Sequence, residues 1–376
     1  MKKVYLLYLL FFTLIISCDN KKNGNEFFNS TIYSPQYSSN FDIKSDDNTG
    51  NVLINVYNPW QGSKNIATQF LIATDSVTSS NFSGQVLKGK AKRIICMSST
   101  HIAMLDELGA VENIVGVSGK QYISNSYIRN KGEEIPDIGY EGNIDYEKIV
   151  AANPDLILLF AINGHSAMEP KLKELGIPYL YIGDYLEENP LGKAEWILPI
   201  AEILGKRELG ISKFQEIEKR YNTLKDEIGL ENKKKPKVMV NAPFLDSWFM
   251  PSIESYVAQL IRDAGGDYIY KKNTGNSSEP IDMEEALQLV SSSDFWINIG
   301  TLNSLEEVIS SFPKFINSKC IQEGNIYNNN FRSTPGGGND CYESGVVNPD
   351  IVLRDLIKIF HPELISEEFT YYQKLE

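Results

Sequence analysis

The chain has 376 residues and a formal net charge of −13, with 49 acidic side chains against 36 basic ones. This length is sufficient for two domains of ordinary size. The acid excess argues against nucleic-acid binding, which requires a basic face that neutralises phosphates. It gives little information about a small ligand, because most charged side chains lie in solvent at a protein surface.

The N-terminus has the pattern of an export signal. Met1-Lys2-Lys3 is basic, and the apolar run from Val4 to Ile16 is shorter than the roughly 20 residues that a transmembrane helix needs. The run ends in Ile15-Ile16-Ser17-Cys18, which resembles the lipobox of bacterial lipoproteins. The resemblance implies a lipoprotein signal peptide at residues 1–17 and acylation of Cys18. An ordinary secretory signal with an incidental cysteine is the alternative.

The segment after the predicted cleavage site is polar. Residues 18–50 are rich in Ser, Asn and Asp and have little apolar content, which predicts a flexible tether. The first residues after Cys18 are basic and amide-rich rather than an acidic run. We therefore expect a membrane-anchored lipoprotein in the periplasm rather than one exported to the cell surface.

Three cysteines remain besides Cys18. Cys96 ends an apolar run and is predicted to be a buried free thiol. Cys320 and Cys341 are able to form a disulfide in an oxidising compartment, and the sequence leaves this open. No pair has the two-residue spacing of a zinc or redox site, so no metal site is predicted.

Strands and helices alternate from residue 51 onward, which is typical of an α/β fold with mainly parallel sheets. Residues 52–56 and 67–73 are predicted to form an N-terminal hairpin added to a first lobe at residues 51–205. Further strands of this lobe are predicted at 93–97, 114–117, 156–160 and 179–182, and helices at 101–108, 145–152 and 166–175.

A long helix is predicted to connect two lobes. Apolar residues repeat at spacings of three and four from Phe214 to Ile228, as on one face of a helix, and the connector is predicted at 206–235. The alternation then restarts in a second lobe at 236–376. Its strands are predicted at 237–241 and 295–299, and its helices at 253–264, 282–290, 304–312 and around Leu353 to Phe360. Ligands of such sheets bind at the carboxyl ends of the strands, so we expect a ligand cleft between the lobes.

Several short motifs support this plan. They are Arg93–His101, Leu105–Ala110, Ile135–Gly139, Asn153–Ile157, Ser255-Tyr256 and Ala264–Tyr268. In this order, over roughly residues 90 to 360, they resemble periplasmic binding proteins for ferric siderophores, haem and cobalamin. The resemblance implies the substrate-binding component of an ABC importer, which passes a metal chelate or tetrapyrrole-type ligand to a permease and its ATPase. We expect a monomer without a cofactor of its own.

Two segments depart from the shorter members of that family. Asn58–Gly62 is one, and the other runs from Asn328 to Asp340 and includes Gly336-Gly337-Gly338. The glycine run is not a phosphate loop, because no Gly-Lys-Ser/Thr follows it. Both segments look like features of a subgroup of larger lipoproteins.

A bulky ligand needs a broad cleft with aromatic walls and a few polar anchors. Ser99, Thr100 and His101 follow the first strand of the first lobe, where the hydroxyls either cap a helix or contact ligand. Phe160 and His165 lie at and after the end of a later strand. His165 is a candidate for contact with the ligand, and Phe160 is expected either in the core or in the cleft. The two histidines are also candidates for axial ligands of a haem or corrinoid metal.

The loop from Asn241 to Pro251 is unusually aromatic, and we expect Trp248 to face the ligand. Trp60 and Tyr140 are further candidates. Arg332 is expected either to pair with a carboxylate or catecholate of the ligand or to form a surface salt bridge.

In the resembled family, one exposed acid on each lobe contacts the permease. The resemblance assigns these roles to Glu169, one turn after Ser166, and to Asp267. Two other functions stay open. One is a surface lipoprotein that serves an outer-membrane receptor, and the other is an enzyme, although no catalytic motif is recognisable.

Overall fold

The computed structural model describes residues 28, 30–74, 82–230, 234–245 and 247–376, and the predicted signal peptide and Cys18 lie outside them. A parallel sheet organises the first lobe, with the strand order β11-β10-β6-β7. Its inner strands are buried on both faces, as a sheet covered by helices requires. The strands are β6 (Ile94–Cys96), β7 (Ile114–Val117), β10 (Leu156–Leu159) and β11 (Tyr179–Tyr181), and the helices include α1 (Ser99–Glu107), α2 (Ser126–Asn130), α3 (Tyr146–Ala152) and α4 (Glu169–Leu175).

A second sheet, of order β14-β12-β16-β17-β18, organises the second lobe. Its neighbours are parallel except for β18, which runs antiparallel to β17. The strands are β12 (Lys237–Val240), β14 (Asp267–Tyr268), β16 (Phe295–Ile297), β17 (Ile326–Asn328) and β18 (Gln373–Lys374). The helices are α8 (Tyr256–Asp263), α9 (Met283–Ser292), α10 (Leu305–Ser311), α11 (Lys319–Gln322), α12 (Ser344–Val347) and α13 (Pro349–Phe360).

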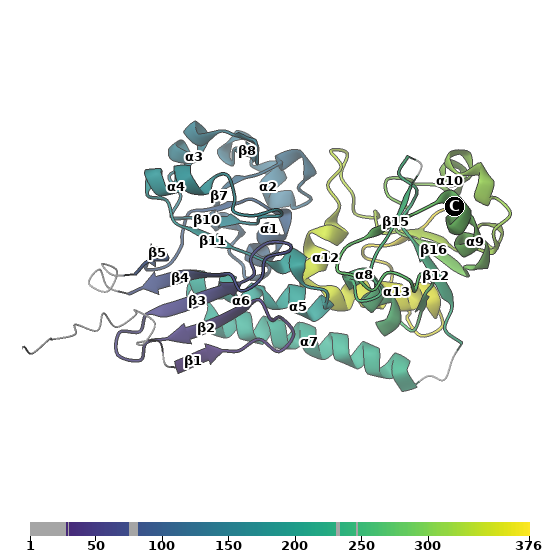
Figure 1. The fold of residues 1–376 in the computed structure, drawn as a ribbon, viewed down its shortest axis with the longest axis horizontal. Coiled ribbons are helices and arrows are strands. Elements are labelled where there is room, and N and C mark those ends of the chain that lie inside the picture. Colours follow the sequence, from purple (N-terminus) through teal and green to yellow (C-terminus); the bar gives the residue numbers. More distant parts are fainter. Residues whose placement is uncertain (1–27, 29, 75–81, 231–233, 246) are drawn as a thin grey trace, which may run out of the picture.

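One long helix, α7 (Arg207–Leu230), runs beneath both lobes (Figure 1). It packs against α6 (Ile197–Leu204) of the first lobe and α13 of the second. Arg220 Nε lies 2.6 Å from Asp350 Oδ2, and Tyr221 donates to Asp263 at 2.7 Å. The predicted fold class, two α/β lobes with mainly parallel sheets joined by one long helix, is confirmed.

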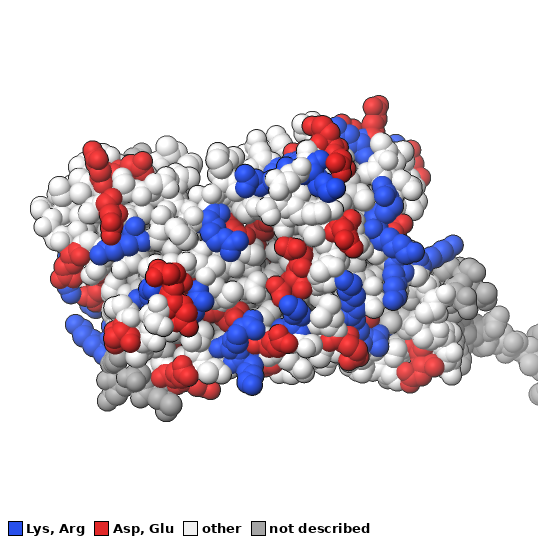
Figure 2. Space-filling view, turned by 180° about the vertical axis from the view of Figure 1, so that it is seen from behind, with Lys and Arg blue, Asp and Glu red and all other residues white. Residues whose placement is uncertain are grey.

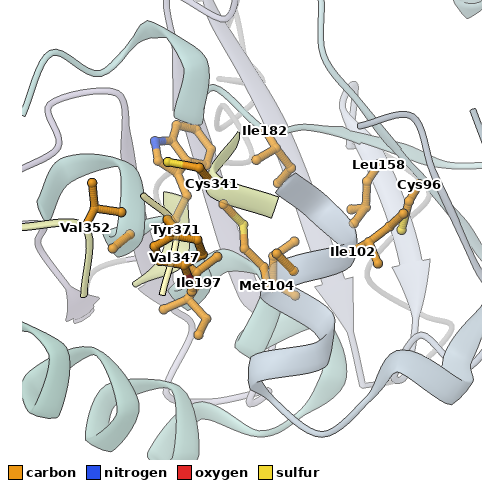
Figure 3. Packing of buried hydrophobic residues seen from close by; sticks show 14 of the residues in the cluster. Cys96, Ile102, Met104, Leu158, Ile182, Ile197, Cys341, Val347, Val352 and Tyr371 are labelled. Atoms are coloured by element: carbon orange, nitrogen blue, oxygen red, sulfur yellow. The ribbon is translucent and has the colours of Figure 1, made fainter. Parts of the chain in front are cut away.

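The two lobes also share apolar packing. Helix α1 of the first lobe packs directly on α12 of the second. Ile102 and Met104 from α1 lie in the same cluster as Cys341, Val347 and Tyr371 (Figure 3). The hydrophobic core therefore continues from one lobe into the other.

A five-stranded sheet precedes the first lobe, with the order β1-β2-β3-β4-β5. Its strands are β1 (Ser30–Tyr33), β2 (Phe41–Ser45), β3 (Val52–Tyr57), β4 (Ala67–Ala73) and β5 (Gln85–Lys88). The predicted hairpin is present as β3 and β4. The predicted tether to residue 50 is wrong for β1 and β2, because Phe41 and Ile43 are only 2% and 1% exposed. The polar composition of the segment hid this alternating buried face.

A buried carboxylate fastens this N-terminal sheet to the first lobe. Glu195, in α5 (Pro190–Glu195), accepts a hydrogen bond from the Tyr33 hydroxyl at 2.7 Å. It also accepts the backbone amides of residues 36–38 at 2.7 to 2.9 Å. Glu195 is fully buried, so each of these bonds forms away from competing water.

Cys96, Cys320 and Cys341 are all buried free thiols, so the possible disulfide does not form. Within the described ranges, no helix combines the length and apolar character needed to cross a membrane.

Replacing Glu195 is predicted to loosen the N-terminal sheet. Glu195→Ala leaves one half-buried hydroxyl and three backbone amides without their acceptor, so the free energy of unfolding should fall by about 3 kcal/mol. Urea denaturation checks this, with Glu208→Ala on the exposed side of α7 as control. A loss as small as the control's would contradict the anchoring role.

Candidate functional site

The loop after β6 holds three predicted ligand residues, and the structure separates them. Ser98, not Ser99 or Thr100, caps α1, because its Oγ accepts the Thr100 amide at 3.3 Å. Ser99 and Thr100 are half-buried at the helix start. His101 is fully buried, and neither ring nitrogen has a hydrogen-bond partner. Burial lowers the pKa of His101 to about 3, so the ring is neutral. The prediction that His101 contacts ligand or ligates its metal is wrong, because α1 turns the ring into the core.

The loop after β10 brings His165 against the N-terminal sheet. The ring centroids of Trp60 and His165 are 4.4 Å apart, and Trp60 lies 6.1 Å from Tyr181. His165 is exposed, and its Nδ1 lies 2.7 Å from Glu169 Oε1. Trp60 is almost buried, so its larger role is to seat the β3–β4 turn on the first lobe.

Glu169 is an internal acceptor rather than a surface acid. It is 7% exposed and accepts hydrogen bonds from Tyr181 at 2.5 Å and Tyr179 at 2.7 Å. Burial by itself raises the pKa of Glu169, but the bonds from Tyr181, Tyr179 and His165 outweigh it and hold the pKa below its ordinary value. The structure therefore contradicts an exposed contact to a permease at this position.

A pocket of about 330 Å³ lies between the two lobes, next to the β3–β4 turn. The N-terminal sheet, the first lobe and the second lobe each line part of it. Tyr185 forms one wall, where its hydroxyl donates to the Ala161 carbonyl and accepts the Gln61 amide at 3.2 Å. Phe160 lies half-buried behind this wall, with its ring 6.4 Å from Tyr185. The lining residues are Gln61, Gly62, Tyr185–Glu188, Lys193, Ser252, Ser255, Tyr256 and Asn276–Ser278.

Lys193 lies at the base of this pocket. Its Nζ donates to the Asp184 carbonyl at 2.8 Å and lies 5.3 Å from the centre of the Tyr256 ring. Burial lowers the pKa of Lys193, while the charges of Asp184 and Glu187 oppose that effect. Burial raises the pKa of Asp184, and the charge of Lys193 opposes this rise. The ammonium is thus held by the protein's own groups.

A larger pocket of about 900 Å³ opens on the first lobe. Tyr140, in β8 (Gly139–Tyr140), lines it and is 64% exposed, which fits the predicted ligand role. Tyr122 lines it as well, is 58% exposed and was missed from the sequence. Tyr122 could have been identified from its position after β7, because loops at the carboxyl ends of strands hold ligands in such folds.

The glycine run of the second lobe closes against this region. A Cβ at Gly336 would overlap the carbonyl oxygen of Gln121, and one at Gly338 would lie 2.6 Å from that of Tyr122. Nearby, the Glu343 carboxylate accepts the amides of Ser124 and Asn125 at 2.7 Å each. The segment from Gly336 to Glu343, here called the interlobe clasp, therefore joins the two lobes through close backbone approach at the glycines and through the Glu343 carboxylate.

Trp248 does not face a ligand. It is 0% exposed in β13 (Trp248–Met250), which pairs with β15 (Glu279–Ile281). Its Nε1 donates to the Val240 carbonyl at 2.9 Å, and its ring packs 5.3 Å from Trp296 and 5.7 Å from Phe315. The prediction failed because aromatic residues elsewhere in the chain cover this face of the strand.

The same loop exposes other apolar side chains instead. Phe244 is 68% exposed, Leu245 84% and Phe249 44%. Leu245 has a φ of 53°, a left-handed conformation that is strained for leucine and is found mostly where surrounding structure imposes it. Alternation along β13 gave the signal for Phe249, since neighbouring residues of a strand face opposite sides.

The two remaining predicted residues lie at the surface of the second lobe. Arg332 pairs with Asp340 at 2.9 Å and lies over the Tyr371 ring, which matches the salt-bridge alternative. Asp267 has a side chain 40% exposed and pairs with Lys271 at 2.7 Å. Asp267 is thus accessible, whereas Glu169 is not.

Comparison with known proteins places the chain in a family. The family model described as periplasmic binding protein matches residues 94–331. The chain belongs to the periplasmic binding protein family. It is thus a binding protein rather than an enzyme. An uncharacterised lipoprotein of Methanocaldococcus jannaschii is 28% identical over 90% of this chain and 84% of its own length.

Solved structures share the fold at low identity. A periplasmic haem-binding protein from Pseudomonas aeruginosa is 16% identical with a TM-score of 0.58, covering 76% of this chain and 98% of that one. A protein of an ABC-type Fe³⁺-hydroxamate transport system from Saccharomonospora viridis is also 16% identical, with a TM-score of 0.54, covering 73% and 94%. The N-terminal sheet lies outside the matched family residues.

The clasp is predicted to make stability depend on pH. Burial raises the pKa of Glu343 from 4.5 to about 7, with Asp340 and Asp106 adding to the rise. The folded state thus holds a proton that the unfolded chain releases, and the free energy of unfolding falls as pH rises between these values, by up to about 3 kcal/mol. Urea unfolding at pH 5 to 8 measures the fall, and Glu343→Gln should remove it. An equal pH dependence in the variant would exclude Glu343 as its source.

Proposed function

We propose that this protein is the substrate-binding component of an ABC importer for a bulky metal chelate, of the iron-siderophore, haem or corrinoid type. The observation that carries the proposal is a pocket whose walls come from both lobes. A ligand held there contacts both lobes at once, so a permease that engages both lobes can detect whether the pocket is filled. Membership of the periplasmic binding protein family supports this role.

Exposed apolar side chains support a bulky ligand. An exposed apolar side chain beside a pocket can serve binding, and several exposed side chains lie in or near segments that follow strands of both lobes. These side chains are Tyr122, Tyr140, Ile162, Phe244, Leu245, Phe249, Phe331 and Tyr342. Two of the solved structures of this fold are described as binding haem and as part of Fe³⁺-hydroxamate transport.

His165 is the remaining candidate for a metal contact on the ligand. Its Nδ1 faces Glu169, which leaves Nε2 for a ligand. A carboxylate behind a histidine is the usual arrangement at metal sites, since it fixes the ring orientation. We retain Ser99, Thr100, Trp60 and Phe160 as positioning residues around the pocket, and Asp267 as the accessible acid for a permease contact.

We also propose that the protein is a monomer held at the outer face of a membrane by lipid on Cys18. A relative of similar length is described as a lipoprotein, which supports this. Two or more acyl chains give stable anchoring, whereas one chain binds only reversibly.

A titration tests the ligand class. Residues 19–376 are titrated with haemin, cyanocobalamin, a ferric hydroxamate and a ferric catecholate, and tryptophan fluorescence reports binding. At least one should bind, and Tyr140→Ala should weaken it about five- to tenfold, because one aromatic contact is lost. Leu209→Ala, exposed on α7, is the control. Failure of all four ligands to bind would sink the ligand class.

Mass spectrometry of the full-length protein tests the anchor. The protein should fractionate with membranes and carry acyl groups on the N-terminal cysteine, and Cys18→Ser should release it as a soluble, unacylated chain. Membrane association that survives this change would rule out a lipid on Cys18.

A further inference from the structure

The charge of the two pockets limits the ligand further. We infer that the interlobe site selects a chelate that carries no net negative charge and has an amide- and hydroxyl-rich periphery. The inference rests on the proposed function and narrows it. It disfavours haem and catecholate complexes, which are anionic, and favours hydroxamate complexes and corrinoids.

Acidic side chains outnumber basic ones along both pockets. The interlobe pocket has Glu187 and Glu188 against Lys193. The larger pocket on the first lobe has Asp137 and Asp145 against Lys148. An anion placed in either pocket would meet a net repulsion that is strengthened wherever protein replaces water.

The basic groups near the pockets are already engaged. Lys193 donates to the Asp184 carbonyl at 2.8 Å. Lys148 donates to the Asp137 carbonyl at 3.1 Å and lies 3.7 Å from Asp145. Arg332, beside the clasp, is paired with Asp340 at 2.9 Å. A propionate or catecholate would have to share each of these cations with the acceptor that it already contacts, which weakens the attraction that the anion gains.

The two carboxylates of the interlobe pocket, Glu187 and Glu188, form no ion pair with a cation among the described residues. Glu187 accepts hydrogen bonds from Ser38 at 2.5 Å and from Asn40 and Trp196 at 3.0 Å, all uncharged donors. Glu188 is exposed and forms no ion pair within the described part of the chain. Partial burial raises the pKa of Glu188, as do the charges of Glu254 and Glu187. Two of these carboxylates, Glu187 and Glu188, line the pocket.

Uncharged polar groups complete the lining. Gln61, Asn276, Ser277 and Ser278 all border the interlobe pocket. Amides and hydroxyls both donate and accept, so they suit ligand groups that do the same, such as hydroxamates, peptide bonds and the amide side chains of a corrin. Tyr185 and Tyr256 supply flat apolar surface beside them.

The N-terminal sheet fixes Gln61 at this wall. Trp60 packs on His165, the Gln61 amide binds the Tyr185 hydroxyl at 3.2 Å, and Ser63 donates to the Trp60 carbonyl at 2.5 Å. Gly62 follows with a φ of 76°, which keeps the turn tight. This sheet lies outside the matched family residues, and its β3–β4 turn supplies Gln61 and Gly62 to the pocket wall, so we assign it a role in specificity.

A simpler explanation is that the whole chain is acidic, with a net charge of −13. Acidic and basic side chains are nevertheless intermixed over the face in Figure 2. Changing one charge far from the pockets therefore distinguishes the electrostatic field of the whole protein from that of the pocket residues. Glu306 is exposed at the start of α10 and borders neither pocket, so it serves as the matched site.

The experiment compares four probes by fluorescence titration and calorimetry at low and moderate salt. Cyanocobalamin and ferrioxamine B carry no net negative charge, whereas haemin and ferric enterobactin do. One of the first two is expected to bind at least about tenfold more tightly than either anionic probe. Tighter binding of haemin or enterobactin would overturn the inference while leaving the proposed function intact. Binding of none of the four would remove the proposed function and the inference together.

Charge variants locate the effect. Glu188→Lys is expected to reduce the ratio of affinities for the favoured and the anionic probes by about tenfold. Glu306→Lys makes the same change in net charge and should leave this ratio within about twofold. Gln61→Ala should weaken the favoured probe without improving the anionic ones. Equal effects of the two lysine variants would overturn a local origin of the selectivity. Circular dichroism and urea unfolding confirm that each variant is folded.

Discussion

The apolar contact between α1 and α12 is the constraint on which the rest of the structure depends. It makes the cores of the two lobes one continuous cluster, and α7 spans both lobes on the opposite side. Close-packed interiors resist small displacements, so the loops that border the interlobe pocket keep a nearly fixed separation. The clasp adds close backbone approaches between the lobes at Gly336 and Gly338, and hydrogen bonds from first-lobe amides to the Glu343 carboxylate. The pocket is therefore largely formed before a ligand arrives.

Buried carboxylates are the second organising feature. Glu195 seats the N-terminal sheet, Glu169 gathers two tyrosines and His165, and Glu343 joins the lobes. Each accepts several hydrogen bonds, which outweigh the loss of water around the charge at Glu169 and offset it only in part at Glu343. Acidic residues in such a sequence are normally assigned to the solvated surface. These three depart from that expectation, because their donors come from segments distant in the chain.

Periodicity predicted the architecture well and the site only in part. The alternating elements and the repeat from Phe214 to Ile228 are local patterns, so the two lobes and the connecting helix follow from them. The exposure of Tyr140 and His165 agrees with their positions near the carboxyl ends of strands, and their ligand roles stay predictions. Trp248 and His101 were wrongly predicted to contact the ligand. Periodicity indicates which residues share one face of an element, but not which distant segments cover that face. Trp296 and Phe315 cover Trp248, and both lie far along the chain.

The sequence alone determined the order of elements, the class of fold and the family, because these rest on short-range spacing and motifs. It also predicts an export signal that ends before Cys18. Tertiary structure decided which aromatic side chains remain exposed and that β1 and β2 pair as strands. It also decided that Lys148, Arg332 and Lys193 each contact an acceptor of the protein. Those outcomes depend on contacts between distant segments, and the electrostatic character of the binding site follows from them.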